Sequence, residues 1–201
     1  MTGAPFRPGA SPRGSSAQCY WKASRRSAHP SKATFTNNSH PICRSPNLFP
    51  RAEQLGAYAG ERAGWWVRQQ PIEMRYVDPP ARLAFDLVDP PPPRIRMWWR
   101  PNGIPPSDPI LADCLAVYVS GRTLLESAMI ARRTTPLGPG YSALMDHAVW
   151  FHHPPDLSNW LLYEQHSPSG VGGRGLAQGT MFNRTGQLVC TTTLEGYFNR
   201  G

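Results

Sequence analysis

The residues of this 201-residue sequence that could most readily do chemistry lie in MDHAVWFHHPP, residues 145–155. One aspartate and three histidines raise two hypotheses, a metal site and a catalytic pair. In a strand, however, Asp146 and His152 lie on one face, and His147 and His153 lie on the other. A zinc site needs ligands that converge from one direction, and neighbours such as Asp146 and His147 point apart. The pattern therefore favours a strand with aromatic packing whose polar residues need partners, and it predicts no metal.

A second stretch, SPSGVGGRGLAQG at residues 167–179, is rich in glycine. It lacks the spacing of a nucleotide-binding loop, and two interpretations stay open. One is a bulged strand. The other is a backbone segment at Gly172 and Gly173 that meets an anionic cofactor, with Arg174 pairing with a phosphate. Serines that could act as nucleophiles lack a GxSxG elbow, which argues against a serine hydrolase; these are Ser142, Ser167 and Ser169.

The elements that must position these residues begin near residue 71. Alternating apolar residues predict two strands, then one long helix, then four more strands. The turn NRTGQ, with Gly186 able to adopt a positive φ, predicts a hairpin between the last two strands. A helix laid across an antiparallel sheet is an α+β architecture. The predicted strands cover residues 71–77, 94–102, 143–153, 159–167, 174–183 and 188–198, and the helix covers 108–133.

The helix has clear end signals. Asp108 suits the N-cap, and Pro109 suits the first helical position, where its missing N–H costs nothing. Gly121 in its middle costs roughly 1 kcal/mol against alanine, so it needs a reason. Apolar residues recur at helical spacing, as on the apolar face of an amphipathic helix; they are Leu111, Cys114, Leu115, Tyr118, Leu125, Ala128 and Met129.

Charge separates the chain into two parts. Residues 1–70 contain ten Lys or Arg and two acidic residues, whereas residues 71–201 contain eleven of each. The net charge of +8 therefore belongs to the first part alone, and the later part has no basic bias that would favour nucleic acid. Residues 1–45 are rich in Ser, Pro and Arg and predict disorder, and residues 46–70 predict a linker with a short helix. We expect nucleic acid not to be a partner.

The rest of the composition indicates the cellular compartment that we expect for this protein. No run approaches the ~18 apolar residues that span a bilayer, and the N-terminus lacks a secretory signal. Four scattered cysteines form neither a zinc motif nor a disulfide framework, which favours a reducing cytoplasm; they are Cys19, Cys43, Cys114 and Cys190. We expect a cytoplasmic protein of one domain.

Residues 71–201 closely resemble the C-terminal half of the type II (TesB-like) acyl-CoA thioesterases. The matching motifs are D-H-x-x-W-F-H from Asp146, W-L-L-Y from Trp160, S-P-S from Ser167 with R-G at Arg174, and E-G at Glu195. The resemblance implies a hotdog fold, a long central helix wrapped by an antiparallel sheet. That family joins two hotdogs in one chain, and this sequence has the basic tract in place of the first. The resemblance therefore predicts a homodimer or pairing with another hotdog.

The resemblance also implies a function in fatty acid metabolism. These hydrolases convert fatty acyl-CoA to free acid and coenzyme A, with coenzyme A as part of the substrate and no separate cofactor. An Asp, a Ser or Thr and a Gln activate water, and backbone N–H groups at the helix start polarise the carbonyl. Here the three matched positions hold Gly121, Leu144 and Leu194. Their polar groups are gone, so the resemblance predicts hydrolysis that is weak or lost.

Two alternatives follow for function. One is a weak thioesterase in which other side chains substitute for the missing groups; the candidates are Ser142, Asp146, Thr193 and Glu195. The other is a non-catalytic hotdog that binds acyl-CoA or serves as an assembly subunit. Gly121 itself has two interpretations, a vestige of the lost aspartate or a close helix–sheet contact that admits no side chain.

Overall fold

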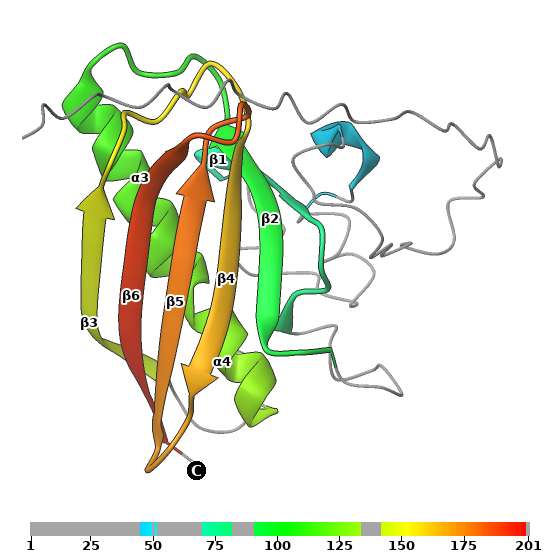
Figure 1. Cartoon of the computed structure of the whole chain (residues 1–201), viewed down its shortest axis with the longest axis vertical. Coiled ribbons are helices and arrows are strands. Elements are labelled where there is room, and N and C mark those ends of the chain that lie inside the picture. The colour runs from blue at the N-terminus through cyan, green and yellow to red at the C-terminus, as the bar shows by residue number, and fades with distance from the viewer. Residues whose placement is uncertain (1–44, 50, 52–69, 82–90, 134–141, 200–201) are drawn as a thin grey trace, which may run out of the picture. The chain divides into compact units, whose positions relative to one another are not determined.

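The computed structural model describes residues 45–49, 51, 70–81, 91–133 and 142–199. Residues 1–44 of the basic tract predicted at 1–45 and most of the linker predicted at 46–70 lie outside the described residues. Within the described ranges, six strands form one antiparallel sheet in the order β1-β2-β4-β5-β6-β3 (Figure 1). The strands are β1 (Ile72–Tyr76), β2 (Arg94–Pro101), β3 (Ser142–Phe151), β4 (Leu161–Ser169), β5 (Arg174–Phe182) and β6 (Leu188–Phe198).

One long helical segment packs against one face of this sheet and crosses it diagonally (Figure 1). It consists of α3 (Pro109–Thr123) and α4 (Leu125–Arg132). The Asp108 side chain accepts a hydrogen bond from the Ile110 N–H at 2.8 Å, which confirms the predicted N-cap. Gly186 has a φ of 86° between β5 and β6, as the hairpin prediction requires. The predicted α+β hotdog arrangement, one long helix packed against an antiparallel sheet, is confirmed.

The core lies between the helical segment and the sheet. The core cluster joins aromatic and aliphatic side chains of β1, β2 and β4 to small residues of α3. The closest approach of the helical segment to the sheet is made by α4, against β2, β4, β5 and β6. Large core residues include Tyr76, Trp99 and Tyr163, all fully buried. The combined helix is long and apolar enough to cross a membrane by composition, but more than half of its most apolar window is buried inside the protein, as in a core helix.

The residues that α3 buries differ from the apolar stripe predicted from the sequence. The residues of α3 that face the core are mainly small, namely Ala112, Ala116, Val119, Ser120 and Thr123. Leu111, Cys114 and Tyr118, which recur at helical spacing, are exposed instead. Only the second half of the predicted stripe, Ala128 and Met129 in α4, is buried. The predicted apolar stripe is therefore buried only in part, since Leu115 and Leu125 are partly buried against the core.

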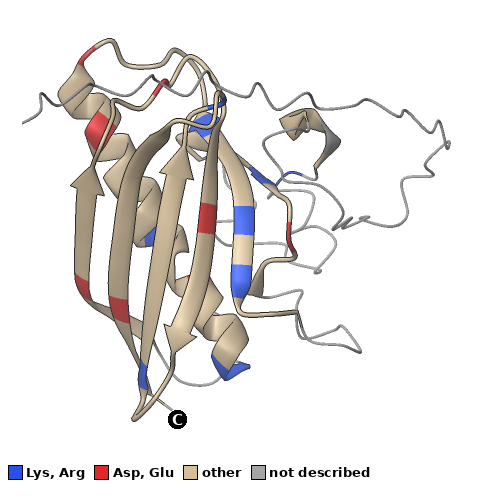
Figure 2. Cartoon of the chain, viewed as in Figure 1, with Lys and Arg blue, Asp and Glu red and all other residues tan. Residues whose placement is uncertain are grey.

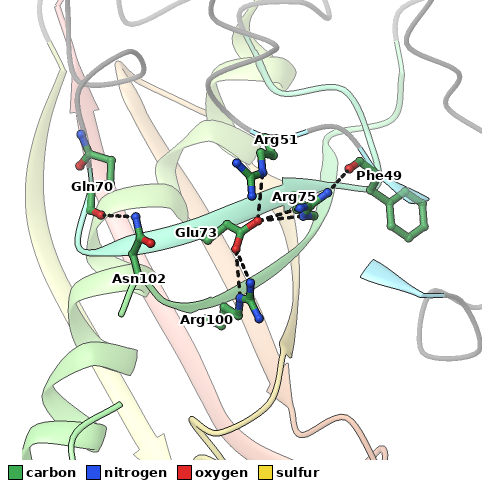
Figure 3. Close-up of polar contacts among 7 residues, drawn as sticks. All are labelled: Phe49, Arg51, Gln70, Glu73, Arg75, Arg100 and Asn102. Carbon is green, nitrogen blue, oxygen red and sulfur yellow. Dashed lines mark hydrogen bonds and ion pairs between the residues drawn. The ribbon is translucent and has the colours of Figure 1, made fainter. Parts of the chain in front are cut away.

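The opposite face of the sheet carries a smaller cluster. Trp98 and Leu162 pack there against Phe49, which follows the short 3-10 helix η2 (Pro46–Leu48). Beside this cluster, Glu73 lies among several arginines (Figure 3). Figure 2 shows two basic positions close together on β2 and an acidic position on the neighbouring β4. The arginines of β2 are Arg94, Arg96 and Arg100, and they form ion pairs with Asp78 and Glu73.

Candidate active site

Gly121 and Leu194 lie on two sides of His147. Gly121 is in the middle of α3, and a Cβ built on it would lie 3.4 Å from Nδ1 and 3.5 Å from Cε1 of His147. Those are ordinary van der Waals distances, so the helix–sheet contact does not exclude a side chain there. Leu194 in β6 is the antiparallel partner of His147 in β3, and it is fully buried.

A β-bulge brings Leu144 to the same face. The register of β3 against β6 shifts between Leu144, which pairs with Gly196, and Asp146, which pairs with Glu195. Gly196 and Leu194 are two residues apart and share a face, so Leu144 faces the helix as His147 does. Leu144 is 48% exposed, so it lies on the helix side of β3 without being covered by the helix. The three matched positions are therefore on the same side of β3 and β6, with Gly121 next to His147. None of the three side chains is polar.

His147 makes a contact that the sequence did not predict. Its Nε2 lies 3.0 Å from Oγ of Ser120 on α3. The Ser120 hydroxyl donates to the Val117 carbonyl oxygen at 3.0 Å, so the ring is assigned Nε2–H, which donates to Ser120. Burial lowers the pKa of His147 below its usual 6.5, against the opposing effect of the Asp146 carboxylate. The imidazole is thus neutral at pH 7, with a bare lone pair on Nδ1 beside Gly121.

Asp146 points to the other side of β3. Its carboxylate accepts the backbone N–H of Glu195 at 3.0 Å. The bulge disrupts the ladder at this point, and the carboxylate satisfies the donor. Asp146 therefore braces the β3–β6 pairing, and Glu195 beside it contacts Arg174 at 3.4 Å. The alternation of β6 puts Thr193 on the same outer face as Glu195.

Among the four candidate substitutes, only Ser142 shares the face of His147. It lies two residues before Leu144 in β3 and pairs with Phe198. Phe198 is four residues beyond Leu194, which is about 13 Å along a strand. Ser142 is therefore on the correct face but displaced along the strand.

The glycine-rich segment forms the hairpin between β4 and β5. Gly172 and Gly173 have φ of 60° and 78°, and the Gly173 carbonyl accepts the Phe198 N–H at 2.7 Å. The positive φ values serve this turn. The Arg174 side chain is 59% exposed, so it remains open to an anion, which would compete with Glu195 for it.

The other two histidines of residues 145–155, His152 and His153, form hydrogen bonds at the end of β3. His152 contacts the Thr191 hydroxyl at 3.1 Å, and His153 contacts the Leu188 carbonyl at 2.8 Å. Both side chains are exposed. Over the ranges that the structure describes, no three His, Cys, Asp or Glu side chains gather as metal ligands.

The start of the helix is far from Gly121. Gly121 follows Pro109, the first residue of α3, by 12 positions. At a rise of 1.5 Å per residue this separation is about 18 Å. Free N–H groups at the start of α3 therefore cannot reach Gly121 of the same chain.

Comparison with known proteins decides the family. A family model described as acyl-CoA thioesterase matches residues 92–197, which is more than half of the chain. The chain belongs to the acyl-CoA thioesterase family. It is 40% identical over 100 residues to acyl-CoA thioesterase 2 of Haemophilus influenzae, and 33% identical over 131 residues to acyl-coenzyme A thioesterase 8 of Rattus norvegicus.

Solved structures agree with this assignment. A tesB protein of Mycobacterium avium subs paratuberculosis is 44% identical, with a TM-score of 0.56 over 67% of this chain. Acyl-CoA thioesterase II of Mycobacterium marinum is 28% identical, with a TM-score of 0.59 over 85% of this chain. A hot dog protein of Alicyclobacillus acidocaldarius, at 19% identity and a TM-score of 0.55 over 88% of this chain, supports the fold alone.

The chain spans only part of each of these thioesterases. The match covers 35% of the Haemophilus influenzae protein and 40% of the Rattus norvegicus protein. It covers 49% and 59% of the two mycobacterial chains. The described hotdog thus corresponds to about half of a typical thioesterase of this family.

Proposed function

We propose that this protein hydrolyses fatty acyl-CoA to fatty acid and coenzyme A at a low rate. Family membership supports the reaction class and the substrate. The observation that carries the low rate is that the three matched positions, Gly121, Leu144 and Leu194, have no polar side chain on the helix side of β3 and β6. Removing one stabilising group commonly costs ~10²–10³ in rate, so losing three leaves little of the usual catalysis.

The experiment that tests this proposal compares two proteins. Release of free thiol is followed with short to long acyl-CoA substrates, using the natural chain and the variant Gly121→Asp/Leu144→Ser/Leu194→Gln. We expect slow release by the natural chain above a heat-inactivated control, and a rate at least ~10²-fold higher for the variant. Equal rates would mean that these positions do not govern turnover, and no release by either protein would contradict hydrolysis.

Leu194 needs a control of its own because it is fully buried. A glutamine there leaves a buried amide that costs about 1–3 kcal/mol if it finds no partner. The double variant Gly121→Asp/Leu144→Ser avoids this cost, and its melting temperature shows whether the triple variant fails by unfolding.

A second candidate function is binding of acyl-CoA without turnover. It is favoured by an intact scaffold in which the three matched positions, Gly121, Leu144 and Leu194, have lost their polar groups. Acyl-CoA that raises the melting temperature, with no thiol released, is the expected result under this alternative. Coenzyme A needs a basic group for its phosphates, and exposed Arg174 beside Gly172 and Gly173 is the proposed contact.

We also propose that the chain pairs with a second copy of itself. Strand β3 is at the edge of the sheet, where its unpaired backbone groups favour association. Exposed apolar residues lie along this edge, including Met145 (56%) and Trp150 (54%). A groove of about 510 Å³ beside α3 is lined by apolar side chains such as Ile104, Leu111 and Tyr118.

Two further observations support a second copy of this chain as the partner that covers the β3 edge and the groove beside α3. The matched segment is only 35% and 40% of the two relatives, which leaves room in those chains for another hotdog. The N–H groups at a helix start are about 18 Å from Gly121 in the same chain, so such donors must come from another copy. A cytoplasmic location belongs to the same proposal, since the cysteines among the described residues, Cys114 and Cys190, are free thiols.

A further inference from the structure

The space beside Gly121 is open and is bordered by the imidazole of His147. Outside α3 itself, the described atoms within 4 Å of a Cβ built on Gly121 are Nδ1 and Cε1 of His147. The missing side chain therefore leaves room for a water molecule next to Nδ1. None of the described residues donates a hydrogen bond to Nδ1.

The other ring nitrogen is held in place by α3. Nε2–H donates to Ser120 Oγ at 3.0 Å, and the Ser120 hydroxyl donates to the Val117 carbonyl at 3.0 Å. Ser120 is fully buried. This contact orients the ring, and with the tautomer assigned above, Nδ1 is the acceptor.

We propose that His147 is the general base of this protein, and that it substitutes for the carboxylate missing at position 121. The inference rests on the proposed thioester hydrolysis and names the residue that drives it. A water beside Gly121 gives a proton to Nδ1 while its oxygen bonds to the thioester carbonyl carbon. The carbon–sulfur bond then breaks, and the leaving thiolate takes the proton from Nδ1. The products are the fatty acid and coenzyme A, and His147 returns to its neutral form.

The charged groups around the ring are compatible with a neutral base. Asp146, on the same strand, acts on His147 through space but points to the other face. On β6 the residue opposite is Leu194, and the next residue, Glu195, contacts Arg174.

Two ionisable side chains of α3 lie near Gly121 in the sequence, Tyr118 and Arg122. The Arg122 guanidinium is 5.9 Å from the centre of the Tyr118 ring. Because burial lowers the pKa of His147 below 6.5, the base is neutral across the physiological range.

The test combines kinetics with a signal that does not depend on activity. Rates of acyl-CoA hydrolysis are measured from pH 5 to 8 for the natural chain, His147→Gln, Gly121→Leu and the matched control His152→Gln. General bases typically contribute ~10²–10⁴-fold. We expect His147→Gln to lower kcat/KM by about 10²-fold, Gly121→Leu to do the same by filling the water space, and His152→Gln to be unchanged. The rate of the natural chain should rise with pH and level off above the lowered pKa of His147, and His147→Gln should lack this rise.

The independent signal is the imidazole nitrogen spectrum of protein labelled with 15N-histidine. His147 is assigned by its loss in His147→Gln, and Ser120→Ala tests the tautomer. We expect a neutral ring with the proton on Nε2 at pH 7, and a shift toward mixed tautomers in Ser120→Ala. Circular dichroism melting curves show that each variant is folded.

The outcomes separate the inference from the function. Turnover that survives His147→Gln overturns the base role and leaves the proposed hydrolysis intact. An Nδ1–H tautomer or a charged ring at pH 7 also overturns the base role. No turnover by the natural chain overturns both proposals. A pH-dependent rate that needs His147 and the space at Gly121, with Nε2–H in the spectrum, supports both.

Discussion

Gly121 occupies a helix position at which an ordinary side chain fits. Its Cβ would meet His147 at 3.4 Å, and glycine in a helix interior costs about 0.5–1 kcal/mol relative to alanine. We therefore expect Gly121→Ala to raise the free energy of unfolding by about 0.5–1 kcal/mol in urea titrations. Gly196→Ala is the matched control, because its Cβ would overlap Leu125 and should destabilise the protein by about 1–3 kcal/mol. A loss of stability in Gly121→Ala would contradict the open space beside His147.

The protonation of His147 is linked to stability. Burial lowers the pKa of its imidazole in the folded chain below 6.5, so the unfolded chain binds the proton more readily. The contribution of His147 is fully present above pH 6.5 and declines as pH falls through the lowered pKa. We expect the melting temperature to fall below pH 6.5, and His147→Gln to flatten this part of the curve. An unchanged profile in that variant would show that the ring is not desolvated.

The bulge in β3 is the element that sets which side chains lie on the side of Gly121. It lets Asp146 reach the Glu195 N–H on the outer face while Leu144 and His147 both face the helix. Asp146→Ala removes this acceptor and should cost about 1 kcal/mol of stability. Asp146→Asn retains an oxygen acceptor, so its loss should be clearly smaller in the same urea titration. Equal losses would mean that charge and not the hydrogen bond holds the bulge.

At the opposite edge of the sheet, Glu73 ties β1 to β2. Its carboxylate accepts from Arg75 at 2.8 Å and from Arg100 at 2.7 Å, and Arg51 lies at 3.1 Å (Figure 3). Burial raises the pKa of Glu73, but the hydrogen bonds and charges of Arg100 and Arg75 outweigh it and leave the pKa below 4.5.

Glu73→Gln should therefore destabilise the chain by about 1–2 kcal/mol, since three arginines lose one counter-charge while two of them stay half exposed. The exposed pair Arg174–Glu195 provides the control. Glu195→Gln should cost less than about 1 kcal/mol in the same denaturant titration. Similar losses in the two variants would show that the Glu73 cluster is no more than a surface ion pair.

For the whole molecule, the unpaired edge of β3 predicts an assembly. Light scattering after size-exclusion chromatography should give twice the 22.3 kDa mass of one chain. Trp150→Lys places a charge on the exposed edge and should shift the protein to the monomer. The control Val171→Lys changes a residue that is 77% exposed at the β4–β5 turn and should leave the dimer intact. A monomer at micromolar concentration in the natural chain would contradict self-pairing.

Much of the fold follows from local sequence. Alternation predicts all six strands, Asp108 and Pro109 start the helix, and Gly186 marks the last hairpin, because each signal depends on residues a few positions apart. The motifs from Asp146 onward are also enough to identify the family. The same motifs locate Gly121, Leu144 and Leu194 as positions that have lost their polar groups.

Only the tertiary structure decided how these positions meet. Strict alternation puts Leu144 on the face of Asp146, and the bulge reverses this because one extra residue of β3 faces β6. The contact between Ser120 and His147 spans 27 residues, and no spacing rule links a helix to a distant strand. The buried residues of α3 are mainly small, and apolar periodicity alone does not encode which of its sides faces the sheet. The sequence by itself thus determined the elements and the family, while the packing of α3 against β3 determined which side chains face the site.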